Sequence, residues 1–191
     1  EHLAYDFLGE TRAPSMLEWD RVAGRVMAAI REREPQRTLI MGPYFFRHLS
    51  KFDFTREPTD SNLILSFFYY VPTVLTHYGL SWSWSSRGYS GPIHYPGRPV
   101  ADQDMHRVPA AIHQYIPGWN EPASRETLAA MIGMAMDKCR RWNMPLYCCE
   151  FGCSLLAPSH LRQQWLHDAL EGFSANRIPW CLWEYRGGMG L

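Results

Sequence analysis

Two glutamates stand at the ends of short apolar runs, and carboxylates in such positions can do acid–base or nucleophilic chemistry. Glu150 follows the apolar run that begins at Pro145, and Gly152 comes shortly after it. Glu10 follows the run that begins at Tyr5. A short apolar run bounded by Pro and Gly is typical of a buried strand. Taken alone, each glutamate could equally end a strand and face water.

The two glutamates become a candidate site if their strands belong to one parallel sheet. Folds of the α/β class place their functional residues at the carboxyl ends of parallel strands. In a barrel, two such ends face each other across the mouth. A pair of carboxylates there suits cleavage of a glycosidic bond, in which one acts as the acid and the other as the nucleophile. Glu10 and Glu150 are therefore our catalytic candidates.

The rest of the chain alternates strands with helices, which is the pattern of parallel βαβ units. Ser15 is the expected N-cap of the first long helix, and Pro35 closes it. Five strands are too few to close an eight-stranded barrel, and a smaller open α/β sheet is the alternative. The predicted strands are 5–10, 38–42, 62–70, 145–152 and 178–185, and the predicted helices are 16–33, a short link within 44–51, 125–142 and 159–176.

The alternation stops between residues 73 and 123, a stretch rich in Gly, Pro, Ser and aromatic residues. A loop this long within a domain is more often functional than accidental. Its aromatic side chains, Trp82 and Trp84 among them, could stack on sugar rings or pack against one another. A further glutamate, Glu121 of Asn120-Glu121-Pro122, lies in this stretch. No apolar strand precedes it, unlike Glu10 and Glu150, so we interpret Glu121 as a loop residue and not as a catalytic candidate.

Four stretches of the chain resemble the motifs of glycoside hydrolase family five, a family of cellulase-like retaining glycosidases. That family carries its acid/base after strand four, a His-x-Tyr pair on strand six, its nucleophile in a Glu-Phe-Gly turn after strand seven and a tryptophan on strand eight. The matching stretches are Leu8-Gly9-Glu10-Thr11, Phe68-Tyr69-Tyr70-Val71-Pro72, Glu150-Phe151-Gly152 and Trp180-Cys181-Leu182-Trp183-Glu184-Tyr185.

The resemblance covers almost the whole chain and implies an α/β fold, the (β/α)8 TIM barrel, of which about five strands (family strands four to eight) are present. Residues 1–191 would then be one partial catalytic barrel with a long aromatic loop at 73–123. The missing strands would come from upstream chain or from a second copy, because open edges of buried strands aggregate or pair.

The resemblance also implies a role for several of the candidate residues. Glu10 would be the acid/base and Glu150 the nucleophile. The hydroxyl of Tyr70 would contact the nucleophile and keep it ionised and oriented. Trp183 would be the indole platform beneath the sugar at the cleavage point, its alternative being a core tryptophan. His77 is a substrate-binding candidate because Thr76-His77-Tyr78-Gly79 resembles the family turn that shapes the sugar cleft. Trp82 and Trp84 are substrate-binding candidates only as aromatic residues of the long loop.

Three positions depart from the family pattern. Gly9 stands where the family has asparagine, Thr11 where it has proline, and Phe68 where it has histidine. Losing several hydrogen-bond donors around a reacting sugar can cost orders of magnitude in rate. Two functions therefore remain open. The first is a retaining hydrolase of β-linked polysaccharide, of the endo-β-1,4-glucanase (cellulase) type. The second is a catalytically degenerate relative that binds a glycan or a protein.

Composition narrows the partners. Lys and Arg together number 19, as do Asp and Glu, and no basic stripe is present, so nucleic acid is a poor partner. No apolar run reaches the roughly 20 residues of a membrane helix. The five cysteines lack the spacing of a zinc site and are expected to be buried, and His160 and His167 to be solvated; we expect neither metal nor cofactor. No signal peptide is recognisable, so only the resemblance implies a secreted or periplasmic location.

Overall fold

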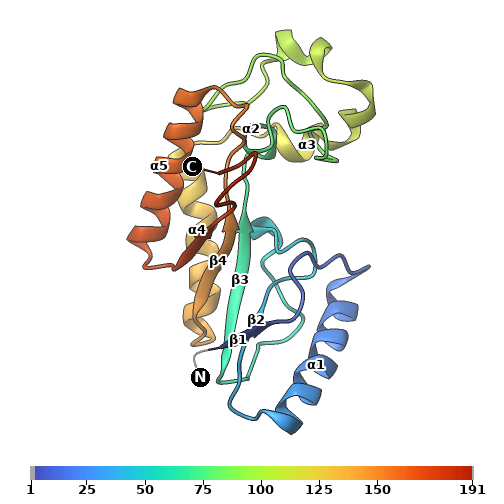
Figure 1. The fold of residues 1–191 in the computed structure, drawn as a ribbon, viewed down its shortest axis with the longest axis vertical. Helices are drawn as coiled ribbons and strands as arrows, with labels where there is room; N and C mark the ends of the chain where they lie inside the picture. Colours follow the sequence, from blue (N-terminus) through green and yellow to red (C-terminus); the bar gives the residue numbers. More distant parts are fainter. Residues whose placement is uncertain (1–2, 191) are drawn as a thin grey trace. The chain divides into compact units, whose positions relative to one another are not determined.

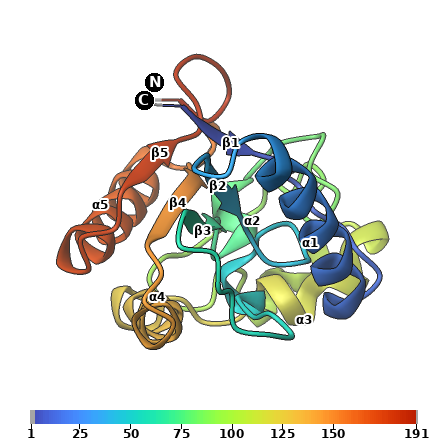
Figure 2. The ribbon, with the colours of Figure 1, turned by 90° about the horizontal axis from the view of Figure 1, so that it is seen from below.

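The computed structural model describes residues 3–190, in which strands and helices alternate along the chain (Figure 1). The strands lie in one five-stranded sheet in the order β1-β2-β3-β4-β5, so neighbours in sequence are neighbours in the sheet (Figure 2). The strands are β1 Ala4–Asp6, β2 Thr38–Met41, β3 Leu63–Tyr69, β4 Leu146–Phe151 and β5 Trp180–Leu182, and the long helices are α1 Met16–Arg33, α4 Arg125–Arg141 and α5 Ser159–Ala175.

The chain divides into two compact units, and each is described here by itself. Both units draw on β3, β4 and β5, since each of these strands contributes residues to both. Unit 1 comprises residues 3–68, 131–149 and 178–180, and unit 2 comprises residues 69–130, 150–177 and 181–190.

Parallel pairing of the first three strands builds the core of unit 1. Ala4 of β1 is in register with Thr38 of β2, and Leu39 of β2 is in register with Leu63 of β3. Leu39 and Leu63 are almost completely buried. Helix α1 begins where predicted, because the side chain of Ser15 accepts a hydrogen bond from the backbone N–H of Glu18 and so caps the helix.

The two outermost strands are shorter than the sequence predicts. β1 ends at Asp6, so Glu10 lies on a bend four residues beyond the strand rather than directly at its end. The carbonyl of Leu8 is bonded to the Arg47 side chain instead of to a neighbouring strand. β5 has three residues, and both edge strands are poorly buried. A strand at the end of the sheet order has a neighbour on one side only, which limits its length.

An aromatic cluster forms the core of unit 2. The Tyr69 ring stacks on Trp165 with centroids 5.8 Å apart, and Phe173 meets Phe151 edge-on at 5.1 Å. The indole N–H of Trp165 donates to the carbonyl of Val71 at 2.7 Å. Aromatic pairs of this geometry add to the free energy gained by burial alone. The cluster therefore fixes α5 against the ends of β3 and β4.

The long segment from 73 to 123 contains short helical pieces and is held down by polar contacts. The Asn120 side chain accepts from the backbone N–H of Val100 at 2.7 Å and donates to its carbonyl at 3.0 Å. Tyr89 and Trp119 are buried, whereas Trp82 is 64% and Trp84 50% exposed. Tyr89 and Trp119 therefore pack inside unit 2, and sugar stacking by Trp82 and Trp84 stays a prediction. The short helices are α2 Thr73–Thr76, η2 Asp102–Arg107, η3 Ala110–Tyr115 and α3 Ile116–Trp119, and η1 Leu49–Lys51 precedes them in unit 1.

All five cysteines are free thiols. Cys139, Cys148 and Cys153 are buried, as predicted, and burial raises the pKa of both Cys139 and Cys153 to about 12. Cys149 is half-buried. The prediction was wrong for Cys181, which is exposed because it lies on the poorly covered strand β5. No helix among residues 3–190 is both long enough and apolar enough to cross a bilayer.

Candidate active site

Glu150 and Tyr70 lie within hydrogen-bonding distance in unit 2. The hydroxyl of Tyr70 donates to Oε1 of Glu150 at 2.6 Å. Glu150 is the penultimate residue of β4, and Tyr70 directly follows β3. Both side chains are half-buried. A hydrogen bond from a hydroxyl to a carboxylate is short and strong, and it both orients the acceptor oxygen and stabilises its negative charge.

His77 and Trp82 extend this pair into a row of rings. The Tyr70 and His77 ring centroids are 4.9 Å apart, and those of His77 and Trp82 are 5.5 Å apart, both edge-on. Nδ1 of His77 is 3.0 Å from the hydroxyl oxygen of Thr76. Burial lowers the pKa of His77 to about 4, so its imidazole is neutral at neutral pH. Four predicted site residues, Glu150, Tyr70, His77 and Trp82, are thus brought together.

Trp183 lies beside the residues that follow Glu150. Its backbone N–H donates to the carbonyl of Phe151 at 2.7 Å. A Cβ atom on Gly152 would collide with the carbonyl oxygen of Trp183, so only glycine allows this close approach. The indole is 47% exposed, which contradicts the alternative of a core tryptophan.

Trp84, the remaining tryptophan candidate, contacts a different ring. It meets Tyr115 of η3 edge-on with centroids 4.7 Å apart. Glu121 is an exposed residue on a bend before α4, which agrees with its interpretation as a loop residue.

Glu10 lies in unit 1, exposed, in a segment that Arg47 holds in place. Arg47 is 1% exposed and its guanidinium donates to both carboxylate oxygens of Asp6 and to the carbonyl of Leu8. It also donates to Ser66 Oγ at 2.8 Å. A Cβ on Gly42 would collide with the Arg47 side chain, so glycine at 42 makes room for it.

Sequence reasoning missed Arg47. The signal that could have found it is a lone arginine after two phenylalanines, close behind the buried strand β2. A charged residue in such a run is either at the surface or buried with a partner. Asp6, on the predicted first strand, was a carboxylate that could have been proposed as the partner of Arg47.

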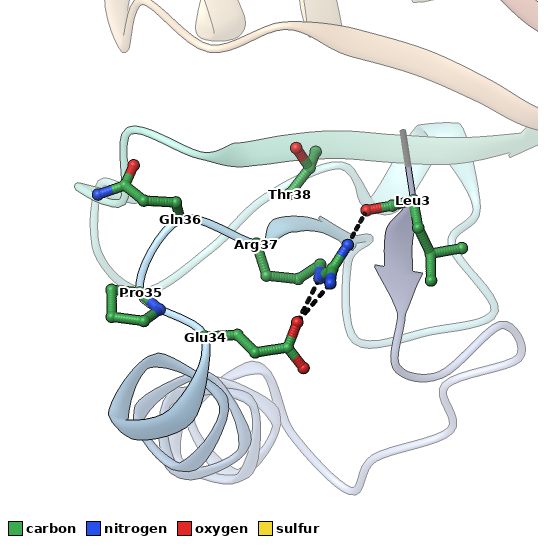
Figure 3. Close-up of a pocket in the computed structure, with 6 residues that line it drawn as sticks. All are labelled: Leu3, Glu34, Pro35, Gln36, Arg37 and Thr38. Atoms are coloured by element: carbon green, nitrogen blue, oxygen red, sulfur yellow. Dashed lines mark hydrogen bonds and ion pairs between the residues drawn. The ribbon is translucent and has the colours of Figure 1, made fainter. Parts of the chain in front are cut away.

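A pocket in unit 1 lies at the amino-terminal ends of the first two strands (Figure 3). Thr38, the first residue of β2, and Leu3, just before β1, are among its lining residues. Arg37 spans it, donating to Glu34 Oε2 at 2.6 Å and to the Leu3 carbonyl at 2.8 Å. Because these groups bond to one another, the pocket offers no obvious reactive group.

In the described part of the chain, the side chains arranged so that they could share a metal ion lie on α5 and not around Glu150. The candidate site in unit 2 therefore consists of a carboxylate held by a tyrosine, together with the exposed indoles of Trp82 and Trp183.

Alternating strands and helices with a carboxylate at the carboxyl end of a parallel strand are the arrangement found in enzymes of the (β/α)8 barrel class. The sequence profile described as Cellulase (glycosyl hydrolase family 5) matches residues 1–188. The chain belongs to this family, as its motifs suggested.

Curated relatives and solved structures agree with this assignment. Endoglucanase C of Acetivibrio thermocellus is 24% identical over 186 residues, which are 97% of this chain and 54% of that relative. An endoglucanase of a Clostridium species matches equally well. The chain thus spans about half the length of the curated relatives it matches.

Among solved structures, the clostridial cellulose synthase subunit Z from Clostridioides difficile superposes with a TM-score of 0.76 at 20% identity, covering 98% of this chain and 55% of that chain. An endoglucanase from the hyperthermophilic Thermotoga maritima superposes with a TM-score of 0.74 at 19% identity, covering 98% and 53%. These likenesses confirm the predicted fold, five strands of a (β/α)8 barrel, over a smaller open sheet.

Proposed function

We propose that the protein containing this chain is a retaining hydrolase of β-linked polysaccharide, of the endo-β-1,4-glucanase type. The observation that carries the proposal is the 2.6 Å hydrogen bond from Tyr70 to Glu150 at the carboxyl end of β4. Membership of the cellulase family and relatives named endoglucanases support it.

In the proposed reaction Glu150 attacks the anomeric carbon and forms a glycosyl-enzyme intermediate. Glu10 protonates the leaving glycosidic oxygen and then takes a proton from the water that hydrolyses the intermediate. The Tyr70 hydroxyl holds Oε1 of Glu150, stabilises the ionised carboxylate and orients it for the attack. No metal or cofactor takes part.

The proposed substrate surface consists of indole rings. Trp82, Trp84 and Trp183 are each about half exposed or more. An indole buries a large apolar face when a pyranose ring stacks on it, and such rings need little conformational ordering to bind. Neutral His77, packed between Tyr70 and Trp82, would position the Trp82 ring without bringing a charge next to Glu150.

The remaining strands of the barrel are part of the proposal. Eight strands close such a barrel, and the described residues contribute five. We propose that further chain or a second copy supplies the rest. A secreted or periplasmic location stays a prediction from the resemblance.

A second candidate function is a degenerate relative that binds glycan without cleaving it. Phe68 favours it, because its ring packs 5.9 Å from the Arg47 guanidinium where the family has a histidine, and a phenyl ring donates no hydrogen bond to a sugar. Gly9 offers no side chain where the family has asparagine.

Release of reducing sugar from soluble carboxymethyl cellulose by the full-length protein separates the two functions. We expect activity that falls by at least about 10³-fold in Glu150→Gln and in Glu10→Gln, since each removes a group that takes part in the chemistry. Tyr70→Phe should lower kcat by about 10-fold or more, because a hydrogen bond to a charged group contributes about 1.5–3 kcal/mol.

Glu121→Gln is the matched control, because Glu121 is an exposed glutamate outside the proposed catalytic pair and its substitution should keep full activity. Absence of activity in the unaltered full-length protein, combined with retention on insoluble cellulose, would replace the hydrolase by the binding module. Loss of activity in Glu121→Gln with Glu10→Gln unaffected would move the acid/base role to Glu121.

A further inference from the structure

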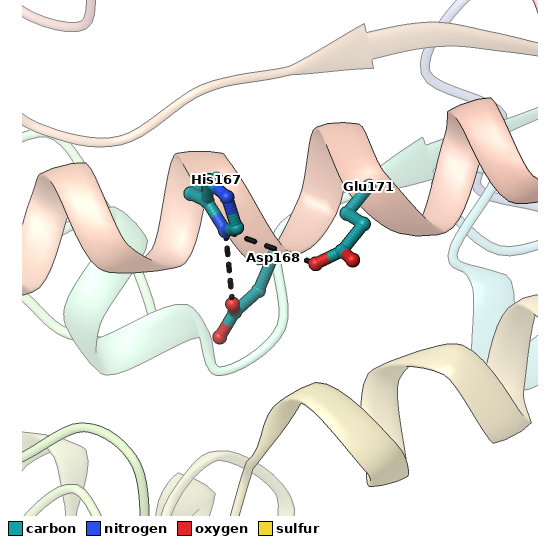
Figure 4. Close-up of side chains that lie close together, drawn as sticks. All are labelled: His167, Asp168 and Glu171. Atoms are coloured by element: carbon teal, nitrogen blue, oxygen red, sulfur yellow. Dashed lines mark ion pairs between the residues drawn. The ribbon is translucent and has the colours of Figure 1, made fainter.

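Three potential metal ligands project from neighbouring positions of α5 in unit 2. They are His167, Asp168 and Glu171, and one ligand atom from each lies within 4.8 Å of the others (Figure 4). Nδ1 of His167 is 3.5 Å from Oδ1 of Asp168 and 3.8 Å from Oε2 of Glu171. Nδ1 of His167 therefore faces both carboxylates at more than hydrogen-bonding distance.

The separations fit ligands of one ion better than hydrogen-bonded partners. An imidazole and a carboxylate that bond to each other approach to about 2.7–2.9 Å. Zinc binds nitrogen and oxygen ligands at about 2.0–2.2 Å in a tetrahedron, which sets neighbouring ligand atoms about 3.4 Å apart. The distances from Nδ1 of His167 to the two carboxylate oxygens, 3.5 and 3.8 Å, are closer to the separation expected of zinc ligands, about 3.4 Å, than to that of a hydrogen bond.

The carboxylate of Glu171 gives an independent indication. Its Oε2 atom is buried and accepts no hydrogen bond from any described residue, while the side chain as a whole is 40% exposed. A buried carboxylate oxygen without a donor costs free energy, and a bound cation would remove that cost. Its other oxygen, Oε1, accepts from the Arg125 guanidinium at 2.5 Å, which turns Oε2 towards His167.

Asp168 is oriented in the same way from the other side. Its side chain is only 10% exposed, and Oδ2 accepts from the hydroxyl of Tyr95 at 2.7 Å, which leaves Oδ1 facing His167. Tyr95 is itself buried, which fixes the position of its hydroxyl beside Asp168. Outer partners of this kind fix the geometry of metal ligands in known sites.

We propose that His167, Asp168 and Glu171 form a binding site for one divalent transition-metal ion of the Zn²⁺ class. Each residue contributes one atom, Nδ1, Oδ1 and Oε2, and water completes the coordination. One nitrogen and two oxygens suit Zn²⁺ better than Ca²⁺, which takes six to eight oxygens. Through Tyr95 and Arg125, the site ties α5 to the long segment and to the start of α4.

Isothermal titration of ZnCl₂ into the chelator-treated full-length protein tests the site. We expect one saturable equivalent that His167→Ala and Glu171→Gln each weaken by more than about 10-fold. Tyr95→Phe should weaken it by about 10-fold, the usual effect of removing an outer partner. Co²⁺ at the same site should give visible ligand-field absorption that His167→Ala abolishes. His160→Ala, an exposed histidine on the same helix, is the matched control and should leave affinity unchanged.

Several results would overturn the site. One is the absence of a saturable equivalent in the unaltered protein; another is equal affinity in His167→Ala, Glu171→Gln and His160→Ala. Binding that disappears in Cys181→Ser would place the ion at that exposed thiol instead. Because His167 is 72% exposed, its substitution leaves the fold intact, which circular dichroism verifies.

Discussion

Arg47 shows how strongly one buried side chain can determine the course of the segment that leads to Glu10. Its guanidinium links the end of β1, through Asp6 and the Leu8 carbonyl, to Ser66 on β3. A buried cation is tolerated only with partners of this kind. In the proposed hydrolase Arg47 acts as a positioning residue, since it holds the backbone that leads to Glu10 without touching substrate.

Replacing Arg47 should be far more damaging than replacing a surface arginine. Arg47→Met leaves Asp6, Ser66 and the Leu8 carbonyl without their donor, and we expect the free energy of unfolding to fall by about 2–4 kcal/mol. Urea denaturation measures it. Arg21→Met, which breaks only the exposed ion pair with Glu18, is the control and should change little. Equal effects in the two variants would show that the buried contacts contribute nothing.

His77 makes stability depend on pH. Its pKa is about 4 in the folded chain and about 6.5 when unfolded, so between these values the unfolded chain binds the extra proton and folding weakens as pH falls. We expect the free energy of unfolding to drop by about 2 kcal/mol more in the native protein than in His77→Gln between about pH 7 and pH 4.5. Parallel curves for both proteins, from urea denaturation at several pH values, would contradict this.

Individual residues were predictable where a local pattern identified them. Glu150 ends an apolar run and Tyr70 follows another, and the structure brings their side chains together. Arg47 escaped prediction because its partners Asp6 and Ser66 are distant in sequence, so only the parallel register of the strands places them next to it. The cluster on α5 was missed for a related reason, since its outer partner Tyr95 comes from the long segment.

At the scale of elements, the helices follow their local signals closely. α1 has the predicted bounds, because the Ser15 cap acts within a few residues of the helix start. Strands depend on neighbours, so their ends were less predictable. Central β3 and β4 lie within one residue of the prediction at each end, whereas edge strands β1 and β5 are shorter than predicted.

The turn after β4 depends on a close backbone approach. Gly152→Ala would push the Trp183 carbonyl away, and we expect a loss of about 1–3 kcal/mol in unfolding free energy together with weaker cellulose retention, because the Trp183 indole moves. Gly133→Ala in α4, where an added Cβ meets no atom within 4 Å, is the control and should stabilise by up to about 1 kcal/mol. Thermal unfolding and a cellulose pull-down measure the two effects, and a neutral Gly152→Ala would contradict the tight contact.

The whole molecule presents two sheet ends with exposed apolar side chains. Leu3, before β1, is 54% exposed, and Trp180 of β5 is 49% exposed. Edge strands with apolar side chains pair with other strands or associate. The fold family was predictable because motifs in order identify it, but what covers these ends was not, since that information lies outside the strands themselves.

The 191-residue chain expressed alone should therefore self-associate. We expect sedimentation velocity to show a concentration-dependent oligomer, and Leu3→Lys combined with Trp180→Lys to shift it to monomer, because charge on an edge opposes pairing. Met134→Lys, on helix α4 and 63% exposed, is the control and should leave the oligomer intact. A monomer at every concentration would show that these ends do not drive association.

The exposed thiol on β5 supplies a chemical reporter of the same surface. Alkylating reagents attack thiolates, and the high pKa values of Cys139 and Cys153 keep those buried groups protonated at neutral pH. Labelling therefore starts at Cys181, on the last strand of the sheet. The rate at which Cys181 is alkylated can be followed by mass spectrometry. That rate should fall when additional strands pair with β5 and cover the thiol, so no engineered probe is needed.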